Sequence, residues 1–308
     1  MITSDFSSHP AAEPLVGEPG FALQSPAKIN LGLRILGGRE NGYHDIETII
    51  QEISLADRLE FRPSGYWRLT CTEEKLGCGE DNLIAQAARK LAETTGHPLK
   101  GALHLVKQIP IGGGLGGGSS NAAVTLIGLA KLWNLNVGLD LVEEIAAEIG
   151  ADCPFFLQGG LAYATERGDK LEWLCGAIPG TVVIVIPEFS VSTKWAYENV
   201  EMSLTKREKS GIIRSLIFQP DPLHALRHGT ANDLEPAVFA RWPELENLKA
   251  SLYDAGADLA ALSGSGATVF GIFRSRLHAE GAAAHFRDRY QTLVCAPMAR
   301  ERPNLPSR

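Results

Sequence analysis

The sequence lacks the features that mark membrane-bound and exported proteins. Its longest clearly apolar strand-like run covers only residues 182–186, far short of the roughly 20 residues that a membrane helix requires. Residues 1–24 contain three acidic side chains and no lysine or arginine, so they have neither the cationic start of a signal peptide nor the arginine-rich character of a transit peptide. We therefore expect a cytoplasmic protein with no membrane partner, in which residues 1–24 form a flexible tail.

Paired cysteines and an excess of basic residues are also missing. The five cysteines are an odd number with no Cys-x-x-Cys pair, in a chain too long to need disulfide staples, which fits a reducing compartment. The 29 lysines and arginines are outnumbered by 36 aspartates and glutamates, giving a net charge of −7. A general nucleic-acid-binding protein would present a strongly basic face, so we expect no nucleic-acid partner.

The 308 residues are enough for about two domains, and strand-like runs alternate with helical periodicities. In the first unit we expect strands over residues 28–35, 46–53, 58–62, 66–71, 102–106, 161–164 and 170–174, and helices over 83–96, 119–133 and 140–149. In the second we expect strands over 181–186, 259–262 and 268–273, and helices over 193–200, 206–218, 243–255 and 275–290. The pattern predicts an α+β protein.

Glycine is in excess, and the excess is concentrated in one place. Of the 32 glycines, six fall within the seven positions 112–118, between an expected strand and an expected helix. Glycine tolerates positive φ and has no side chain, so backbone N–H groups in such a loop can converge on an anion. The following helix adds its unpaired N–H groups and its dipole. The segment therefore predicts a phosphate-binding loop, and the apolar helix directly after it argues against the alternative of a flexible linker.

Two common phosphate-binding motifs do not fit this loop. A Walker A loop requires Gly-Lys-Ser/Thr, whereas no lysine occurs between residues 112 and 120. Gly112, Gly114 and Gly117 match the dinucleotide fingerprint formally. That fingerprint also requires an acidic residue at the end of a strand about twenty positions later, and Asp140 instead precedes a helical run. A Rossmann domain is therefore not expected.

Three short motifs follow one another in order along the chain. Residues 110–120 carry Pro-Ile-Gly-Gly-Gly-Leu-Gly-Gly-Gly-Ser-Ser, residues 26–31 carry Pro-Ala-Lys-Ile-Asn-Leu, and residues 262–267 carry Leu-Ser-Gly-Ser-Gly-Ala. They resemble the nucleotide-binding, N-terminal and C-terminal motifs of the GHMP kinase superfamily, which includes the galactose, homoserine, mevalonate and phosphomevalonate kinases. The resemblance implies a two-domain α+β fold: a ribosomal-protein-S5-like ATP-binding and catalytic domain over residues 25–175 and a ferredoxin-like α/β sandwich that binds substrate over residues 180–298.

Further motifs indicate a branch of the superfamily. Gly-Tyr-His at residues 42–44, Asp-Asn-Leu at 81–83 and Gly-Ala-Asp-Cys-Pro-Phe-Phe at 150–156 are similar to the kinases that phosphorylate the 2-hydroxyl of a methylerythritol carrying a cytidine diphosphate group, in the non-mevalonate synthesis of isoprenoid precursors. The resemblance therefore implies ATP, with Mg²⁺ carried along with it, and a small-molecule substrate with a cytidine diphosphate group. A monomer or weak homodimer is expected.

The resemblance also assigns residues. It implies that Asp152 is the catalytic base and that Lys28 lies beside it, where its charge would keep the carboxylate ionised; by residue type alone, a solvated carboxylate and an exposed strand lysine are the more ordinary interpretations. Asn82 and Lys107 are expected to contact ATP, with a surface helix cap and a surface lysine as their alternatives, and Ser119 and Ser120 are expected to offer hydroxyls. The full set expected at ATP is Pro110, Ile111, Gly112, Gly113, Gly114, Leu115, Gly116, Gly117, Gly118, Ser119, Ser120, Asn82 and Lys107.

For the other substrate, the resemblance implies that Tyr43 and His44 bind the cytosine, that Thr193 and Tyr197 form the opposing wall, and that Asn30 orients the erythritol hydroxyls. No protein-held metal is expected, because His224 and His228 have no third ligand nearby in the sequence. Cys153 is interpreted as a packed thiol. Two alternatives stay open: another GHMP kinase of the homoserine or mevalonate type, and a catalytically silent sensor that binds nucleotide.

Overall fold

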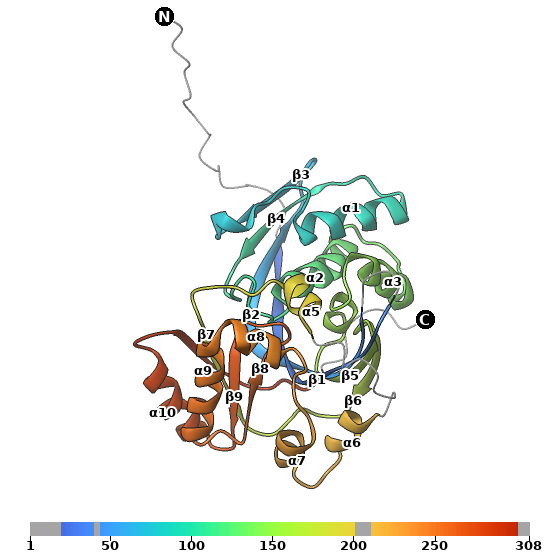
Figure 1. Cartoon of the computed structure of the whole chain (residues 1–308). Helices are drawn as coiled ribbons and strands as arrows, with labels where there is room; N and C mark the ends of the chain where they lie inside the picture. Colours follow the sequence, from blue (N-terminus) through green and yellow to red (C-terminus); the bar gives the residue numbers. More distant parts are fainter. Residues whose placement is uncertain (1–19, 40–43, 201–210, 301–308) are drawn as a thin grey trace, which may run out of the picture.

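The computed structural model describes residues 20–39, 44–200 and 211–300, and Figure 1 shows two domains that each pack helices on a sheet. The first domain contains β1 (Phe21–Gly38), β2 (His44–Arg62), β3 (Trp67–Cys71), the 3₁₀ turn η1 (Glu74–Leu76), α1 (Leu83–Thr95), β4 (Gly101–Val106), α2 (Gly117–Leu132), α3 (Leu139–Ile149), α4 (Cys153–Phe156), β5 (Leu161–Glu166) and β6 (Lys170–Leu174). Its six-stranded sheet has the order β3-β4-β2-β5-β6, with β1 paired to β2.

The second domain is built on a four-stranded antiparallel sheet of order β10-β7-β9-β8. Its elements are β7 (Thr181–Ile186), α5 (Thr193–Glu198), α6 (Ile212–Leu216), α7 (Pro222–Gly229), α8 (Glu235–Arg241), α9 (Pro243–Asp254), β8 (Leu259–Leu262), β9 (Val269–Phe273), α10 (Arg276–Phe286) and β10 (Gln291–Cys295). The strand order and the two helices α9 and α10 on one face are those of a ferredoxin-like sandwich, which confirms the expected α+β fold.

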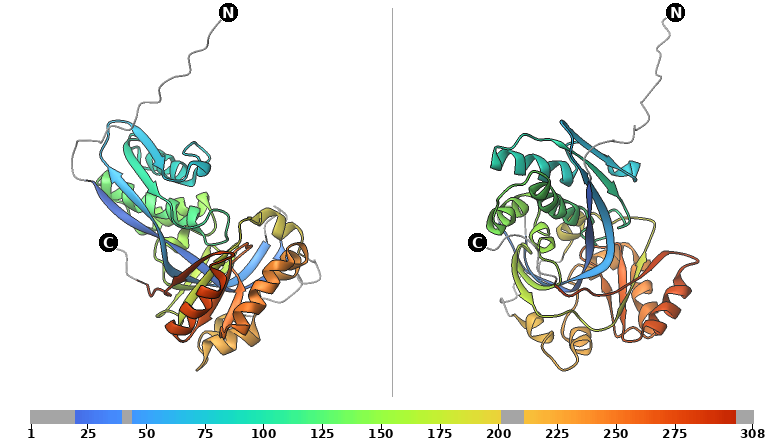
Figure 2. Two further views of the ribbon diagram at one scale, coloured as in Figure 1. Left: turned by 90° about the vertical axis from the view of Figure 1, so that its left-hand side faces the viewer. Right: turned by 180° about the vertical axis from the view of Figure 1, so that it is seen from behind.

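Strands β1 and β2 form a long hairpin that runs through both domains (Figure 2). Inside the first domain, one apolar core lies between the sheet and helices α1, α2 and α3. A second core joins the domains, because Ile29, Leu31 and Ile49 of the hairpin pack with Ile184 and Phe270 of the second sheet. The two domains therefore share a continuous apolar interior behind the glycine loop.

The structure differs from the sequence-based expectation at several elements. The expected strands over 46–53 and 58–62 are one strand, β2, because Ser54 and Leu55 bulge out of it opposite Pro26 and Ala27 and β1 stays paired on both sides. Strand β1 begins at Phe21 and pairs residues 21–24 with β2, so these four residues are not part of a tail; residues 1–19 lie outside the described residues. The expected helix over 206–218 appears in the described part as α6 alone.

The expected elements do not include η1, α4, α7, α8 or β10. The end of the described chain returns to the first domain. After β10, Ala296 and Met298 hydrogen-bond to Ser54 and Glu52 of β2. No helix in the described ranges has the length and apolar character needed to cross a bilayer.

Candidate active site

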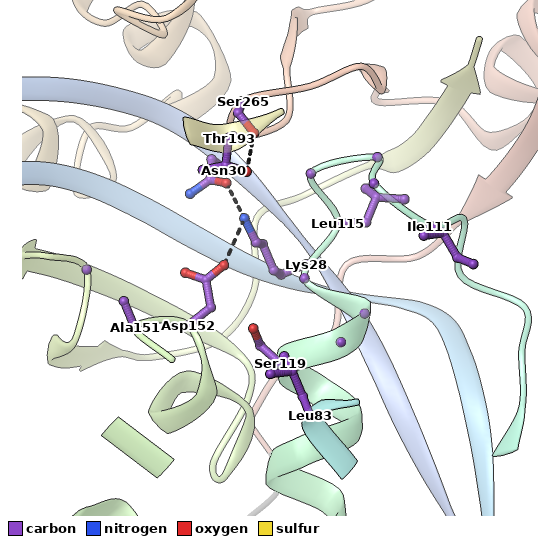
Figure 3. A pocket seen from close by; sticks show the side chains of 18 of the residues that line it. Lys28, Asn30, Leu83, Ile111, Leu115, Ser119, Ala151, Asp152, Thr193 and Ser265 are labelled. Carbon is purple, nitrogen blue, oxygen red and sulfur yellow. Dashed lines mark hydrogen bonds and ion pairs between the residues drawn. The ribbon is translucent and has the colours of Figure 1, made fainter. Parts of the chain in front are cut away.

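A cavity of about 990 Å³ lies where the two domains meet, and the glycine loop forms one side of it (Figure 3). The residues that line it come from β1, β2, η1, the start of α1, the glycine loop, α2, the turn between α3 and α4, the β5–β6 turn, α5 and the 263–266 turn. Of the residues expected at the site, the cavity is lined by Lys28, Asn30, His44, Asn82, Lys107, Pro110, Ile111, Gly112, Gly113, Gly114, Leu115, Gly116, Gly117, Gly118, Ser119, Asp152, Thr193 and Tyr197. Tyr43 lies outside the described residues.

The glycine loop needs glycine for both conformation and space. Gly112, Gly114 and Gly116 have φ of 71°, 75° and 71°, in the region that side chains disfavour. A β-carbon on Gly114 would lie 2.1 Å from the carbonyl oxygen of Ser263, and one on Gly116 would lie 2.7 Å from Cζ of Phe156. The loop ends at α2, whose N-terminus has no side-chain cap. Its first-turn N–H groups therefore provide an anion-binding site.

The expected catalytic pair is in place at the centre of the cavity. Lys28 Nζ lies 3.5 Å from Asp152 Oδ2 and donates a 2.6 Å hydrogen bond to Asn30 Oδ1. The Lys28 side chain is 5% exposed and that of Asp152 is 37% exposed, so the lysine is fixed while the carboxylate remains accessible to a ligand. Asn30 Nδ2 donates in turn to Thr48 Oγ1 at 3.0 Å. Figure 3 shows Lys28 between Asn30 and Asp152, with Ser119 beside them.

The second glycine segment, residues 263–266, closes against the first. Ser263 Oγ donates to the carbonyl of Gly114 at 3.0 Å, and the N–H of Thr268 donates to the carbonyl of Gly113 at 3.3 Å. Ser265 Oγ lies 2.9 Å from Thr193 Oγ1 at the start of α5. The C-terminal motif therefore positions both the phosphate loop and the helix that carries Tyr197.

A buried carboxylate that sequence analysis missed holds the base of the loop. Asp57 is 0% exposed and accepts hydrogen bonds from the N–H groups of Gln108 and Ile109 at 2.7 Å each. It also accepts from Lys107 Nζ at 2.8 Å and from Asn121 Nδ2 at 2.9 Å. Burial lowers the pKa of Lys107, and the charge of Asp57 opposes that shift. Asp57 joins the chain entering the loop to the helix leaving it.

Two of the expected ATP contacts have structural roles. Ser120 is 0% exposed, does not line the cavity and accepts a 2.8 Å hydrogen bond from Ser25 Oγ. Ser120 therefore does not offer its hydroxyl to the cavity, contrary to the expectation. It is the residue after Ser119 in α2, and its side chain points from the helix into the protein interior. Asn82 lines the cavity but also caps α1, accepting from the N–H of Ile84 at 2.9 Å and donating to Gly77 O at 2.8 Å.

At the other end of the cavity, the rings of His44 and Tyr197 lie 5.3 Å apart with an interplanar angle of 30°. The two rings contact each other directly, so they do not form two walls around an open slot. Burial lowers the pKa of His44 below its usual 6.5, which favours a neutral imidazole with one donor and one acceptor. Burial and the charge of Asp152 raise the pKa of Tyr197. Arg167 and Lys194, which sequence analysis did not select, add positive charge to the lining.

Cys153, His224 and His228 do not line the cavity. Burial raises the pKa of Cys153 to about 12, so the thiol is neutral and packed, as expected. His224 and His228 lie side by side on α7 with ring centroids 4.5 Å apart. Within the described ranges, no three His, Cys, Asp or Glu side chains gather as a metal site would require.

The fold and this site define a class. A glycine loop leading into α2, a lysine and aspartate facing it, and a ferredoxin-like domain closing over it are the architecture of the GHMP small-molecule kinases. Residues 82–160 match the GHMP kinase N-terminal domain and residues 221–292 match the GHMP kinase C-terminal domain. A homoserine kinase from Cytophaga hutchinsonii shares the fold, with a TM-score of 0.70 over 96% of this chain and 98% of that one at 16% identity.

Sequence similarity identifies the family to which this chain belongs within the GHMP kinases. The 4-diphosphocytidyl-2-C-methyl-D-erythritol kinase of Prosthecochloris aestuarii is 40% identical over 273 residues, covering 88% of this chain and 95% of the relative. A solved structure of a 4-(cytidine 5'-diphospho)-2C-methyl-D-erythritol kinase aligns with a TM-score of 0.74 at 31% identity, covering 89% of this chain and 98% of that one. The chain belongs to the 4-diphosphocytidyl-2-C-methyl-D-erythritol kinase family.

Replacing Gly114 by alanine tests the contact between the two glycine segments. Because the new β-carbon would overlap Ser263 O, we expect the loop to move and kcat/KM for ATP to fall by roughly 100-fold, the scale of an ångström misplacement. Gly96→Ala is the matched control: Gly96 has φ of 67° but no atom within 4 Å of an added β-carbon. It should cost about 1–2 kcal/mol of stability with kinetics unchanged. Equal kinetic losses in both variants would contradict a specific role for the contact.

Proposed function

We propose that the protein transfers the γ-phosphoryl group of ATP to the 2-hydroxyl of 4-diphosphocytidyl-2-C-methyl-D-erythritol, as a step in isoprenoid precursor synthesis. The observation that carries this proposal is the Lys28–Asp152 pair, 3.5 Å apart, beside the uncapped N-terminus of α2. The names of the relatives and of the 31% identical structure support the choice of acceptor.

The glycine loop and the N-terminus of α2 form the proposed binding site for the ATP phosphates. Phosphoryl transfer has a loose transition state, so an enzyme mainly aligns the two oxygens and neutralises charge. First-turn N–H groups of α2, with Lys107 and the Ser119 hydroxyl, would bind the phosphates. Mg²⁺ usually takes one or two carboxylates together with substrate phosphates and water. Asp152 and Ser119 supply oxygen donors that fit such an ion arriving with ATP, and its charge would neutralise the phosphates.

Asp152 and Lys28 are the residues that activate the acceptor hydroxyl. The accessible carboxylate of Asp152 accepts the proton of the substrate's 2-hydroxyl as the hydroxyl oxygen attacks the γ-phosphorus, and the bond from that phosphorus to the β,γ-bridging oxygen breaks to release ADP. The Lys28 ammonium, held by Asn30, neutralises charge that develops between the carboxylate and the phosphoryl oxygens. Asn30 also orients the erythritol hydroxyls, and the neutral imidazole of His44 donates to and accepts from the cytosine edge. Tyr197, a partly buried ring, presents an apolar face to the base, with Thr193 at the same end of α5.

A coupled ADP-release assay with three acceptors tests the function. We expect turnover with 4-diphosphocytidyl-2-C-methyl-D-erythritol and none with homoserine or mevalonate, because neither of those carries a base for His44 to recognise. Turnover with homoserine or mevalonate instead would favour another GHMP kinase. Nucleotide binding without any turnover would favour the silent sensor, in which Lys28 and Asp152 have no task. We also propose that the enzyme acts in the cytoplasm as a monomer or weak homodimer, without nucleic-acid or membrane partners.

The variant Asp152→Asn removes the base and keeps the side-chain volume. We expect kcat to fall by about 10²–10⁴-fold, the usual contribution of a positioned base. Asp81→Asn is the control, since it removes another carboxylate that lines the same cavity and should keep kcat. A wild-type kcat in Asp152→Asn would rule out the assignment.

The pH dependence of substrate binding tests His44. Because burial lowers the pKa of His44, the neutral imidazole is present at pH 7 and is lost as the pH falls through that lowered value. KM for the cytidine substrate should therefore be flat above pH 6.5 and rise, by about tenfold per unit below the pKa, while KM for ATP stays constant. His44→Gln keeps a donor and an acceptor but does not titrate, so the acidic rise should disappear. If KM for the cytidine substrate still rose at acidic pH in this variant, a group other than His44 would be responsible for the pH dependence.

A further inference from the structure

One segment of the second domain is fastened directly to the strand that carries Lys28. Asn232 forms a bridge with Leu33 of β1: the N–H of Leu33 donates to Ala231 O at 3.1 Å, and the N–H of Asp233 donates to Leu33 O at 2.8 Å. The approach is close because Gly32 has no side chain; a β-carbon there would lie 2.5 Å from Thr230 Oγ1. The segment is thus held five residues beyond Lys28 on the same strand.

The side chain of Asn232 extends this attachment to the second glycine segment. Asn232 is 1% exposed. Its Nδ2 donates to the carbonyls of Leu262 at 2.9 Å and Gly264 at 2.7 Å, and its Oδ1 accepts from the N–H of Leu234 at 3.0 Å. Both amide protons and the amide oxygen are therefore used, and no other side-chain type of this size supplies two donors and an acceptor in this arrangement.

The turn held by Asn232 lies against Lys28 and Asn30. A β-carbon on Gly264 would lie 3.2 Å from Asn30 Oδ1 and 3.5 Å from Lys28 Nζ. The neighbouring Ser263 bonds to the phosphate loop at Gly114. Asn232 itself does not line the cavity, so its amide acts on the cavity residues indirectly, through the carbonyls of Leu262 and Gly264.

We propose that Asn232 is a positioning residue for phosphoryl transfer: its amide sets the distance between the 263–266 turn and the Lys28–Asn30 pair. The proposal rests on the proposed function, because the quantity that it controls is the rate of that reaction. Without the amide, the carbonyls of Leu262 and Gly264 lose their shared donor in a buried position, where an unsatisfied group is costly. The Gly264 peptide is then free to shift against Lys28, while Ser263 and Ser265 keep their own hydrogen bonds to the phosphate loop at Gly114 and to Thr193 of α5.

The experiment measures kcat, both KM values and the melting temperature for Asn232→Ala and for the milder Asn232→Ser. We expect kcat to fall by about 100-fold in the alanine variant, the scale of an ångström misplacement, and by less in the serine variant, with both KM values within about threefold. Tyr253→Phe is the control: it removes a 3.1 Å hydrogen bond to Ala260 O in the same strand, β8, away from the cavity. It should lower the melting temperature without lowering kcat.

The outcomes separate the two proposals. A wild-type kcat in a folded Asn232 variant would overturn the positioning role. The role would also be overturned if Tyr253→Phe and Asn232→Ser had the same melting temperature and lost kcat to the same extent. A rise in both KM values with kcat unchanged would also overturn it, since that pattern indicates damage to binding. If wild-type protein fails to phosphorylate the cytidine substrate, the proposed function and the positioning role fall together.

Discussion

The close approach of two backbones, at Gly114 and Ser263, is the contact on which the site depends. A β-carbon at Gly114 would lie 2.1 Å from Ser263 O, so this contact exists only because one partner has no side chain. It brings the phosphate loop of the first domain against the 263–266 turn of the second, and the same turn lies against Asn30 and Lys28. The glycine excess of the sequence is thus a requirement of packing as well as of anion binding.

An acidic chain can bind a polyphosphate because the relevant charge is local. The net charge is −7, yet the cavity lining combines Lys28, Lys107, Arg167 and Lys194 with the uncapped start of α2, against the carboxylates of Asp81, Asp152 and Glu198. Lys107 is paired with the fully buried Asp57, so that pair adds little net charge. The backbone N–H groups and dipole at the start of α2 therefore supply a local attraction for phosphate that the total charge of the chain does not describe.

The sequence predicted the features that depend on neighbouring residues and missed those that depend on how distant segments pack together. The glycine loop and the start of α2 were predictable because φ preferences and helix N-termini act over a few residues. Lys28 and Asp152 stand 124 positions apart, and only the resemblance to a family predicted that they meet. Asp57 and Asn232 were missed because an isolated Asp or Asn has no local pattern; their roles appear only when segments distant in the chain converge on them. Ser120 was assigned wrongly because the turn of α2 that separates it from Ser119 sends its side chain inward.

The shared interior of the two domains limits how the site can open. Ile29, Leu31 and Ile49 of the β1–β2 hairpin are at most 1% exposed and pack with Ile184 and Phe270 of the second sheet. A hinge between the domains would expose these side chains at about 1.5–3 kcal/mol each, a large share of the marginal stability of a folded chain. The distance from Lys28 to the 263–266 turn is therefore set before substrate arrives. Preorganisation of this kind lowers the barrier only if each buried polar group is held in place. Asn232 and Asp57 lie outside the cavity lining, yet they hold the backbone segments that form it.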